Sequence, residues 1–228
     1  MVKTKYILAA LIIAALLAAG FYLNRNYLSP KLKHHAASNE VRALVENNKF
    51  RNGDIIFQTS MSAQSQAIQL ATNSKYSHCG VVYKDGNEYY VYEAVQPVSV
   101  TPLANWIARG KNGHFVVKRL KNADKVLTPT VLQKMKQAGE QYQGKNYDIY
   151  FEWSDERIYC SELIWKIYKQ TTGLEVGKLE TLKDFNLSSQ AVKQKMQERY
   201  GNNIPLNEKV ISPASMFHSE LLETVAEN

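Results

Sequence analysis

The sequence has no block of lysine and arginine residues interleaved with aromatic side chains, although its net charge is +7. The basic residues are scattered singly among aspartates and glutamates, so we do not expect the chain to bind nucleic acid. A mildly basic protein near an anionic membrane or wall polymer is the simpler interpretation of this charge. Internal repeats and low-complexity tracts are absent as well. Roughly 190 residues come after an N-terminal apolar segment, which suits one domain with a sizeable core.

Cysteine and metal-ligand patterns are also scarce. The chain has two cysteines, Cys79 and Cys160, and in an exported protein such a pair suggests a disulfide by default. His34 and His35 are adjacent but have no cysteine or carboxylate partner at ligand spacing, so a linker is favoured over a metal site. We therefore expect no metal.

Charge is missing from Tyr6 to Leu23, an apolar run preceded by Lys3 and Lys5. Its length is close to the ~20 residues that span a bilayer. A cleaved signal peptide that ends near Ala18-Ala19-Gly20 is the alternative. We favour an uncleaved signal anchor because the run is long for a signal peptide. Either interpretation predicts export.

The rest of the chain is a mixture of strand-like and helix-like segments. Strands are expected in the middle of the chain, between two helical halves, which favours an α+β fold with a small antiparallel sheet. The expected strands cover residues 55–57, 76–83, 89–95 and 115–120. The expected helices cover residues 40–49, 60–72, 103–108, 128–142, 160–172, 188–200 and a segment from 212 onwards.

Two of these strand-like runs flank Asp85-Gly86, the strongest short-range signal for a hairpin. With a two-residue loop there, His78 pairs with Glu93 on one face, and their Cβ atoms lie about 5 Å apart. That distance lets the imidazole and the carboxylate hydrogen-bond, whereas one extra loop residue would put them on opposite faces. The same alternation turns Cys79 away from His78. We therefore expect that Cys79 does not bond to Cys160 if Cys160 meets His78.

Cys160 is predicted to lie in the first turn of a helix. Apolar residues recur after it at helical spacing, and Gly173 is a plausible stop. Unpaired N–H groups and the helix dipole at this end favour the thiolate. The plainer interpretation is a small buried core residue. A neighbouring imidazole would instead make the thiol a nucleophile, and a carboxylate would orient that imidazole.

Four segments, in this order, resemble the papain-like NlpC superfamily of cysteine peptidases and amidases: Gly53–Phe57, Tyr76–Val82, Tyr92–Ala94 and Tyr159–Leu163. In most of that superfamily the cysteine helix comes first, whereas here it comes last. This order resembles the circularly permuted branch, the YiiX/YebB-like group, with lecithin:retinol acyltransferase-like enzymes as relatives. The resemblance extends from about Gly53 to the Ser212-Pro213 region.

The resemblance implies a circularly permuted papain-like fold, with a small antiparallel sheet or barrel packed on helices. Residues 1–24 would be the transmembrane signal anchor or signal peptide. Residues 25–49 would be a linker and leading helix, and residues 50–228 the catalytic domain. The enzyme would lie in a bacterial inner membrane with a periplasmic or extracytoplasmic domain, or be secreted after signal cleavage.

The resemblance also implies roles for individual residues: Cys160 as nucleophile, His78 as base and Glu93 as the residue that orients it. The segment Gly144–Asp148 resembles the superfamily's Gly-Lys-Pro-Tyr stretch, although Asn146 stands where proline is usual. Tyr147 in this segment would contact substrate or support the oxyanion. Aromatic walls of the pocket are expected from Tyr147, Tyr159 and Trp153.

We therefore expect an exported thiol hydrolase that cleaves an amide bond through a thioester on Cys160. It would need no metal and no organic cofactor, because side chains alone supply this chemistry. Its partners would be a peptide, amide or acyl-lipid substrate, and the membrane through the N-terminal segment. Two alternatives stay open: a lipid acyl hydrolase or acyltransferase, and a ligand-binding module without activity.

Overall fold

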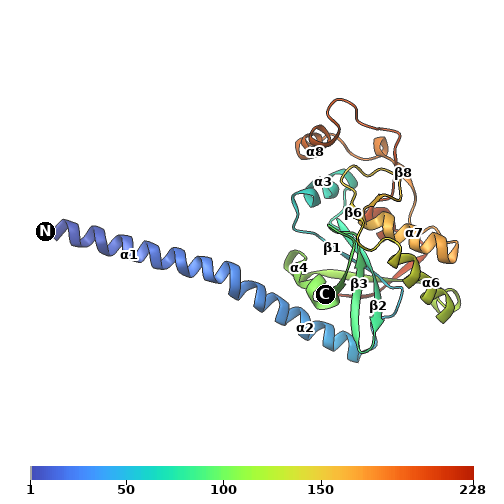
Figure 1. Cartoon of the computed structure of the whole chain (residues 1–228), viewed down its shortest axis with the longest axis horizontal. Helices are drawn as coiled ribbons and strands as arrows, with labels where there is room; N and C mark the ends of the chain where they lie inside the picture. The colour runs from blue at the N-terminus through green and yellow to red at the C-terminus, as the bar shows by residue number, and fades with distance from the viewer. Residues whose placement is uncertain (1) are drawn as a thin grey trace.

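The structure is a computed structural model that describes residues 2–228, with side chains described for Tyr6 and for residues 11–228. An α+β domain lies at the end of a long N-terminal helix (Figure 1). The helices are α1 Val2–Leu23, α2 Ser29–Glu46, α3 Ala63–Thr72, α4 Leu103–Arg109, α5 Ala123–Val126, α6 Pro129–Glu140, α7 Cys160–Thr172, α8 Gln190–Tyr200 and α9 Pro213–Phe217. The strands are β1 Ile55–Gln58, β2 His78–Asp85, β3 Glu88–Glu93, β4 Ser99–Pro102, β5 Phe115–Leu120, β6 Asn146–Tyr147, β7 Arg157–Ile158, β8 Glu180–Thr181, β9 Lys209–Val210 and β10 Leu222–Glu227.

The main sheet has six antiparallel strands in the order β10-β5-β1-β2-β3-β4. Within the described part of the chain, β10 and β4 are its two edges. The expected antiparallel sheet packed on helices is therefore present, but it is an open sheet and not a barrel. Two short pairs, β6-β7 and β8-β9, lie outside it.

Alternating side chains of this sheet enter two different cores. Phe57 and Cys79 face a core that contains the apolar stripe of α7. Ile56 and Val82 face the other core, which α4 and α2 cover. Leu163 on α7 is fully buried, and burying such a side chain stabilises a fold by about 1.5–3 kcal/mol. The predicted helical spacing after Cys160 thus fixes which side of α7 packs against the sheet.

The hairpin between β2 and β3 differs from the expected register by two residues. The loop is Gly86-Asn87, and Asp85 pairs with Glu88. Gly86 has φ +59°, because a two-residue turn of type II′ places glycine at its first central position. A shift of two residues keeps every side chain on its predicted face. His78 and Glu93 are therefore diagonal neighbours and not directly opposed.

The N-terminal region is helical throughout its described length. Residues 24–38, which we expected as a linker, form a π turn at Asn24–Leu28 and then the start of α2. Pro30 cannot donate a backbone hydrogen bond and crowds the preceding turn, and an irregular turn accommodates this defect. α2 then packs on α4, with Ala37 buried between them.

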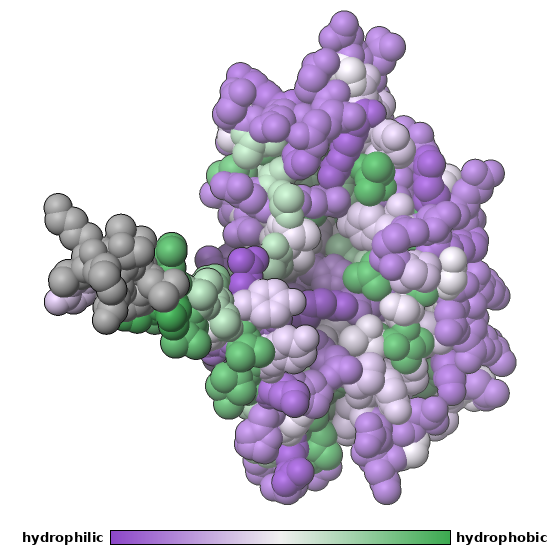
Figure 2. Space-filling view, turned by 60° about the vertical axis from the view of Figure 1, so that its left-hand side comes forward, coloured by the Kyte–Doolittle hydropathy of each residue, from purple (hydrophilic) through white to green (hydrophobic). Residues whose placement is uncertain are grey.

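One helix of the described chain, near its N-terminus, is long and apolar enough to cross a membrane, and a signal sequence passes the same test. Its large apolar side chains lie in the open, with Leu16 at 67% and Leu17 at 70% exposure. Figure 2 shows this apolar helix standing out from a mainly hydrophilic domain surface. An exposed apolar surface of this extent is compatible with membrane association.

Candidate active site

The predicted contact between His78 and Glu93 is confirmed. His78 is the first residue of β2 and Glu93 is the last residue of β3. The imidazole Nε2 lies 2.6 Å from Oε2 of Glu93, whose side chain is fully buried. The ring of Trp106 on α4 stacks against the imidazole with a centroid distance of 5.9 Å. The imidazole is thus fixed both in position and in orientation.

Two residues that the sequence did not suggest complete the surroundings of this carboxylate. Nη2 of Arg109, at the end of α4, donates to Oε1 of Glu93 at 2.7 Å and to Oε2 at 2.5 Å. The hydroxyl of Thr101 on β4 donates to Oε1 at 2.6 Å. Burial raises the pKa of Glu93, but His78 and Arg109 outweigh it and lower the pKa to about 2. Glu93 is therefore anionic at neutral pH.

Cys160 reaches His78 from the opposite side of the sheet. Its helix α7 covers the face that lies opposite His78, and the two side chains meet where β2 begins, within hydrogen-bonding reach. Because Glu93 occupies Nε2, Nδ1 is the ring nitrogen left for the thiol. Burial lowers the pKa of His78, but hydrogen bonds to Cys160 and Glu93 outweigh it and raise the pKa to about 9.

The pKa of the Cys160 thiol is lowered well below its usual value. The largest cause is a hydrogen bond from Cys79; burial opposes the shift, and His78 adds a hydrogen bond and a positive charge. The N-terminus of α7 adds unpaired N–H groups and the positive end of its dipole. These shifts favour a thiolate on Cys160 beside an imidazolium on His78.

The expectation that Cys79 does not bond to Cys160 agrees with the structure, although the two thiols lie close together. Cys79 does face away from His78, but α7 packs on the Cys79 face, so the two thiols are neighbours. Both cysteines are free. Burial, followed by the neighbouring Cys160, raises the pKa of Cys79. Cys79 therefore stays a protonated thiol that can donate to the Cys160 sulfur.

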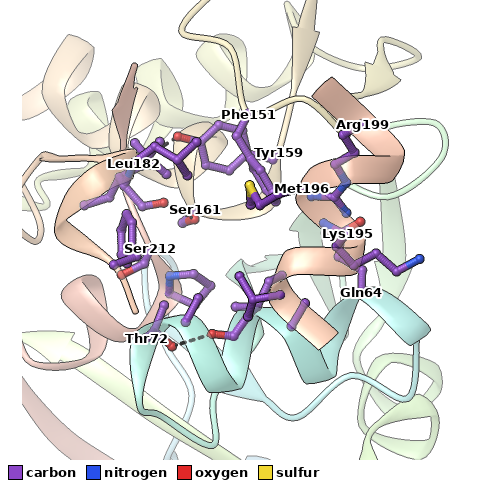
Figure 3. Close-up of a pocket in the computed structure, with 18 of the residues that line it drawn as sticks. Gln64, Thr72, Phe151, Tyr159, Ser161, Leu182, Lys195, Met196, Arg199 and Ser212 are labelled. Carbon is purple, nitrogen blue, oxygen red and sulfur yellow. Dashed lines mark hydrogen bonds between the residues drawn. The ribbon is translucent and has the colours of Figure 1, made fainter. Parts of the chain in front are cut away.

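An apolar cavity of ≈ 70 Å³ opens beside Cys160 between α3 and α8 (Figure 3). Tyr147 and Tyr159 line it as predicted. Trp153 does not line it; this ring packs against Trp165 at 5.3 Å. Most of the other lining side chains are apolar. Many come from α3, α8 and the loop before α8, among them Ile68, Leu182, Phe185, Leu187, Val192 and Met196, and others from the segment Val210–Pro213.

Sequence similarity assigns the chain to a known family. Residues 49–226 match the family described as "Permuted papain-like amidase enzyme, YaeF/YiiX, C92 family". The chain belongs to this family. It is similar to YiiX of Escherichia coli strain K12, described as uncharacterized, with 49% identity over 176 residues, which cover 77% of this chain and 86% of YiiX.

A solved structure supports the same relationship. The crystal structure described as metalloprotein yiiX from Escherichia coli O157:H7 matches with a TM-score of 0.75 and 49% identity, and covers 78% of this chain and 97% of that one. The predicted family and the permuted papain-like α+β fold are therefore confirmed. As a permuted papain-like amidase, the chain is a cysteine peptidase/amidase-type hydrolase.

Proposed function

We propose that Cys160, His78 and Glu93 form a catalytic triad that hydrolyses an amide bond through a thioester on Cys160. The observation that carries this proposal is that a buried carboxylate lies 2.6 Å from Nε2 of the His78 imidazole, whose pKa the neighbouring Cys160 and Glu93 together raise. A nucleophile, a base and a residue that orients the base are the parts that covalent acyl transfer requires.

The steps follow from these positions. The Cys160 thiolate attacks the carbonyl carbon, the carbon–nitrogen bond breaks, and the His78 imidazolium gives its proton to the leaving amine. A thioester remains on the sulfur. His78, now neutral, takes a proton from water as the water attacks this thioester. The carbon–sulfur bond then breaks, the acid is released, and His78 is again protonated beside a thiolate.

We propose two donors for the oxyanion of the tetrahedral intermediate. One is the backbone N–H of Cys160 at the first position of α7, where no helical partner is available. The other is the hydroxyl of Tyr147. This hydroxyl accepts a hydrogen bond from Gln64 Nε2 at 3.2 Å, which leaves its own proton free to donate. Burial raises the pKa of Tyr147, so the proton is retained.

A second candidate function is lipid acyl hydrolysis or acyl transfer, and the apolar cavity beside Cys160 favours it. The cavity is lined mostly by apolar side chains, and Arg199 and Lys195 of α8 lie at its margin (Figure 3). An apolar acyl group would fit there in either function. Comparing turnover of phospholipid vesicles with turnover of an N-acyl amide that has the same acyl group separates the two functions.

We propose that the enzyme is exported and that α1 holds it in a bacterial inner membrane, with residues 1–24 as anchor, 25–49 as leading segment and 50–228 as catalytic domain outside the cytoplasm. The exposed apolar surface of α1 supports this proposal. Secretion after signal cleavage is the alternative. N-terminal sequencing of the mature protein, together with membrane fractionation, distinguishes the two.

The description of the Escherichia coli O157:H7 structure as a metalloprotein raises the question of a metal in this chain. Among the described residues, no three His, Cys, Asp or Glu side chains form a group that could hold a metal ion. The donor set therefore does not fit a metal, and no step above passes through one.

The triad is tested by the mass of the acyl-enzyme. An activated acyl ester should add one acyl group to the wild-type protein and none to Cys160→Ala. Cys79→Ala is the matched control, since it removes the other thiol and should still be acylated. Equal acylation of the wild type and Cys160→Ala would contradict the proposal.

A further inference from the structure

Cys160 and His78 open onto different hollows of the surface. Cys160 lines the apolar cavity between α3 and α8, and His78 lines a second cleft of ≈ 280 Å³. Gln64, Ile68 and Tyr147 line both and separate them. If the proposed triad holds, the acyl carbon binds at the sulfur and the leaving nitrogen binds at the imidazole. The acyl side of the substrate then lies in the apolar cavity, and the amine side in the second cleft.

The chemistry of this second cleft differs from that of the apolar cavity. Most of the side chains that line it are polar, and among the described residues that line it none is acidic. Its cationic groups are the His78 imidazole and Arg109. The Arg109 side chain is 46% exposed, whereas its partner, the Glu93 carboxylate, is fully buried. A bound molecule therefore meets the guanidinium and not the carboxylate. Only one guanidinium nitrogen is used by Glu93, so others remain for a ligand.

A buried amide in the same cleft lacks a partner. Gln58 on β1 is 1% exposed, and its Oε1 has no hydrogen-bond partner among the described residues. A Cβ at Gly110 would lie 2.0 Å from this oxygen, so the amide occupies space that only a glycine leaves free. An unsatisfied buried carbonyl costs about 1–3 kcal/mol. This oxygen packs against Gly110, so Gln58 shapes the wall of the cleft and does not itself present a free acceptor to a bound molecule.

We propose that this cleft is the subsite for the amine half of the substrate, and that it selects amines that carry a carboxylate, as an amino acid or a peptide C-terminus does. Arg109 binds the carboxylate, for which a guanidinium is geometrically suited. Gln58 forms part of the wall beside the same group. This inference rests on the proposed triad and adds to it the class of the leaving amine.

The test uses the acyl-enzyme and lets amines compete with water for it. A p-nitrophenyl ester supplies the acyl group, and either L-alanine or L-alaninamide is then added as acceptor. These two amines differ in the carboxylate, and the ratio of acylated amine to free acid is measured for each. An amine that binds in the cleft intercepts the thioester by the reverse of the amide-cleavage step.

Ser62 provides a variant outside the catalytic network. It lines the cleft and caps α3, where its hydroxyl accepts from the Ser65 N–H at 3.3 Å. Asp and Asn cap helices about as well as Ser. Ser62→Asp therefore adds a negative charge to the cleft, and Ser62→Asn is its neutral control. For each variant we compare the yield of acylated L-alanine with the yield of acylated L-alaninamide. We expect this ratio to be about tenfold lower for Ser62→Asp than for Ser62→Asn.

The outcomes separate the inference from the function on which it rests. If no acyl-enzyme forms, the triad itself is overturned. If the acyl-enzyme forms but water alone accepts the acyl group, the subsite is overturned and the triad stands. The same conclusion follows if Ser62→Asp and Ser62→Asn give equal ratios. If Ser62→Asp lowers acyl transfer to L-alanine but not to L-alaninamide, the result supports a subsite for a carboxylate-bearing amine.

Discussion

At the scale of single residues, the protonation state of each proposed triad side chain depends on the side chains around it. Against the opposing effect of burial, His78 and Arg109 lower the pKa of Glu93 to about 2, and Cys160 and Glu93 raise the pKa of His78 to about 9. The thiolate, the imidazolium and the carboxylate are therefore charged together over a wide range of pH. A shift of one pKa unit corresponds to about 1.4 kcal/mol of differential interaction.

This coupling predicts the pH dependence of amide cleavage. The rate should rise as pH passes the lowered pKa of Cys160, because the thiolate forms. It should fall above pH 9, because His78 loses the proton that the leaving amine needs. The measurement is kcat/KM against pH for an amide. A p-nitrophenyl ester, whose leaving group needs no proton, should show no such fall. An amide profile that still rises well above the pKa of His78 would contradict this assignment.

Cys79 has a role that can be measured separately. Cys79→Ala removes the hydrogen bond to the sulfur of Cys160, so the pKa of Cys160 should rise. Cys79→Ser keeps a donor and should restore most of the shift. The measurement is the pH dependence of alkylation by iodoacetamide. Identical profiles for wild type and Cys79→Ala would show that the two thiols do not interact.

Some of this site could be predicted from residues alone. The period of two in a strand was enough to put His78 and Glu93 on one face. Arg109 and Thr101 could not be found in the same way, because they join Glu93 from other elements through tertiary packing. The neighbourhood of Cys79 and Cys160 was missed because no sequence pattern states which face of the sheet a distant helix covers.

At the scale of elements, the β2-β3 hairpin is set by its turn. The apolar alternation predicted both strands, but it cannot distinguish registers that differ by two residues, because these bury the same side chains. The register is instead determined by Gly86, whose positive φ places the turn at Gly86-Asn87. The C-terminal strand β10 was not predicted at all. An irregularity between Thr224 and Ala226 interrupts its pairing with β5, and a bulge removes the simple alternation.

Gly86→Ala should therefore destabilise the fold. Alanine at this left-handed position costs about 1 kcal/mol. Nothing lies within 4 Å of a Cβ at residue 86, so the cost comes from the backbone and not from a clash. Asn87→Ala, in the same turn, should cost much less. Urea denaturation measures both. Equal loss of stability in the two variants would argue against this turn.

At the scale of the whole molecule, the N-terminal helices divide into a free part and a packed part. α1 extends away from the domain, and α2 packs along α4 (Figure 1). Trp106 and Arg109 both belong to α4, so α2 supports the element that holds His78 and Glu93. α2 is therefore structurally part of the domain, whereas α1 is not.

Removing residues 1–28 should therefore leave the stability of the domain unchanged, whereas removing residues 1–46 should lower it by about 2–3 kcal/mol. The second truncation exposes apolar surface that α2 covers, including the contacts of Ala37, and burial of such surface contributes on this order. Thermal unfolding of the two truncated proteins gives the comparison. Equal midpoints would show that α2 adds nothing to the domain.

The sulfur and the ring that activates it come to their meeting point from opposite sides of one sheet, and they belong to segments far apart in the chain, with His78 early and Cys160 late. During translation the β2-β3 hairpin, which carries His78, therefore leaves the ribosome long before α7, which carries Cys160. Until α7 packs on the sheet, the Cys160 thiol is not activated by His78, and the His78 imidazole has no thiol to activate. The active site is therefore complete only after the C-terminal part of the polypeptide has been synthesised and folded, so the unfinished enzyme is inactive.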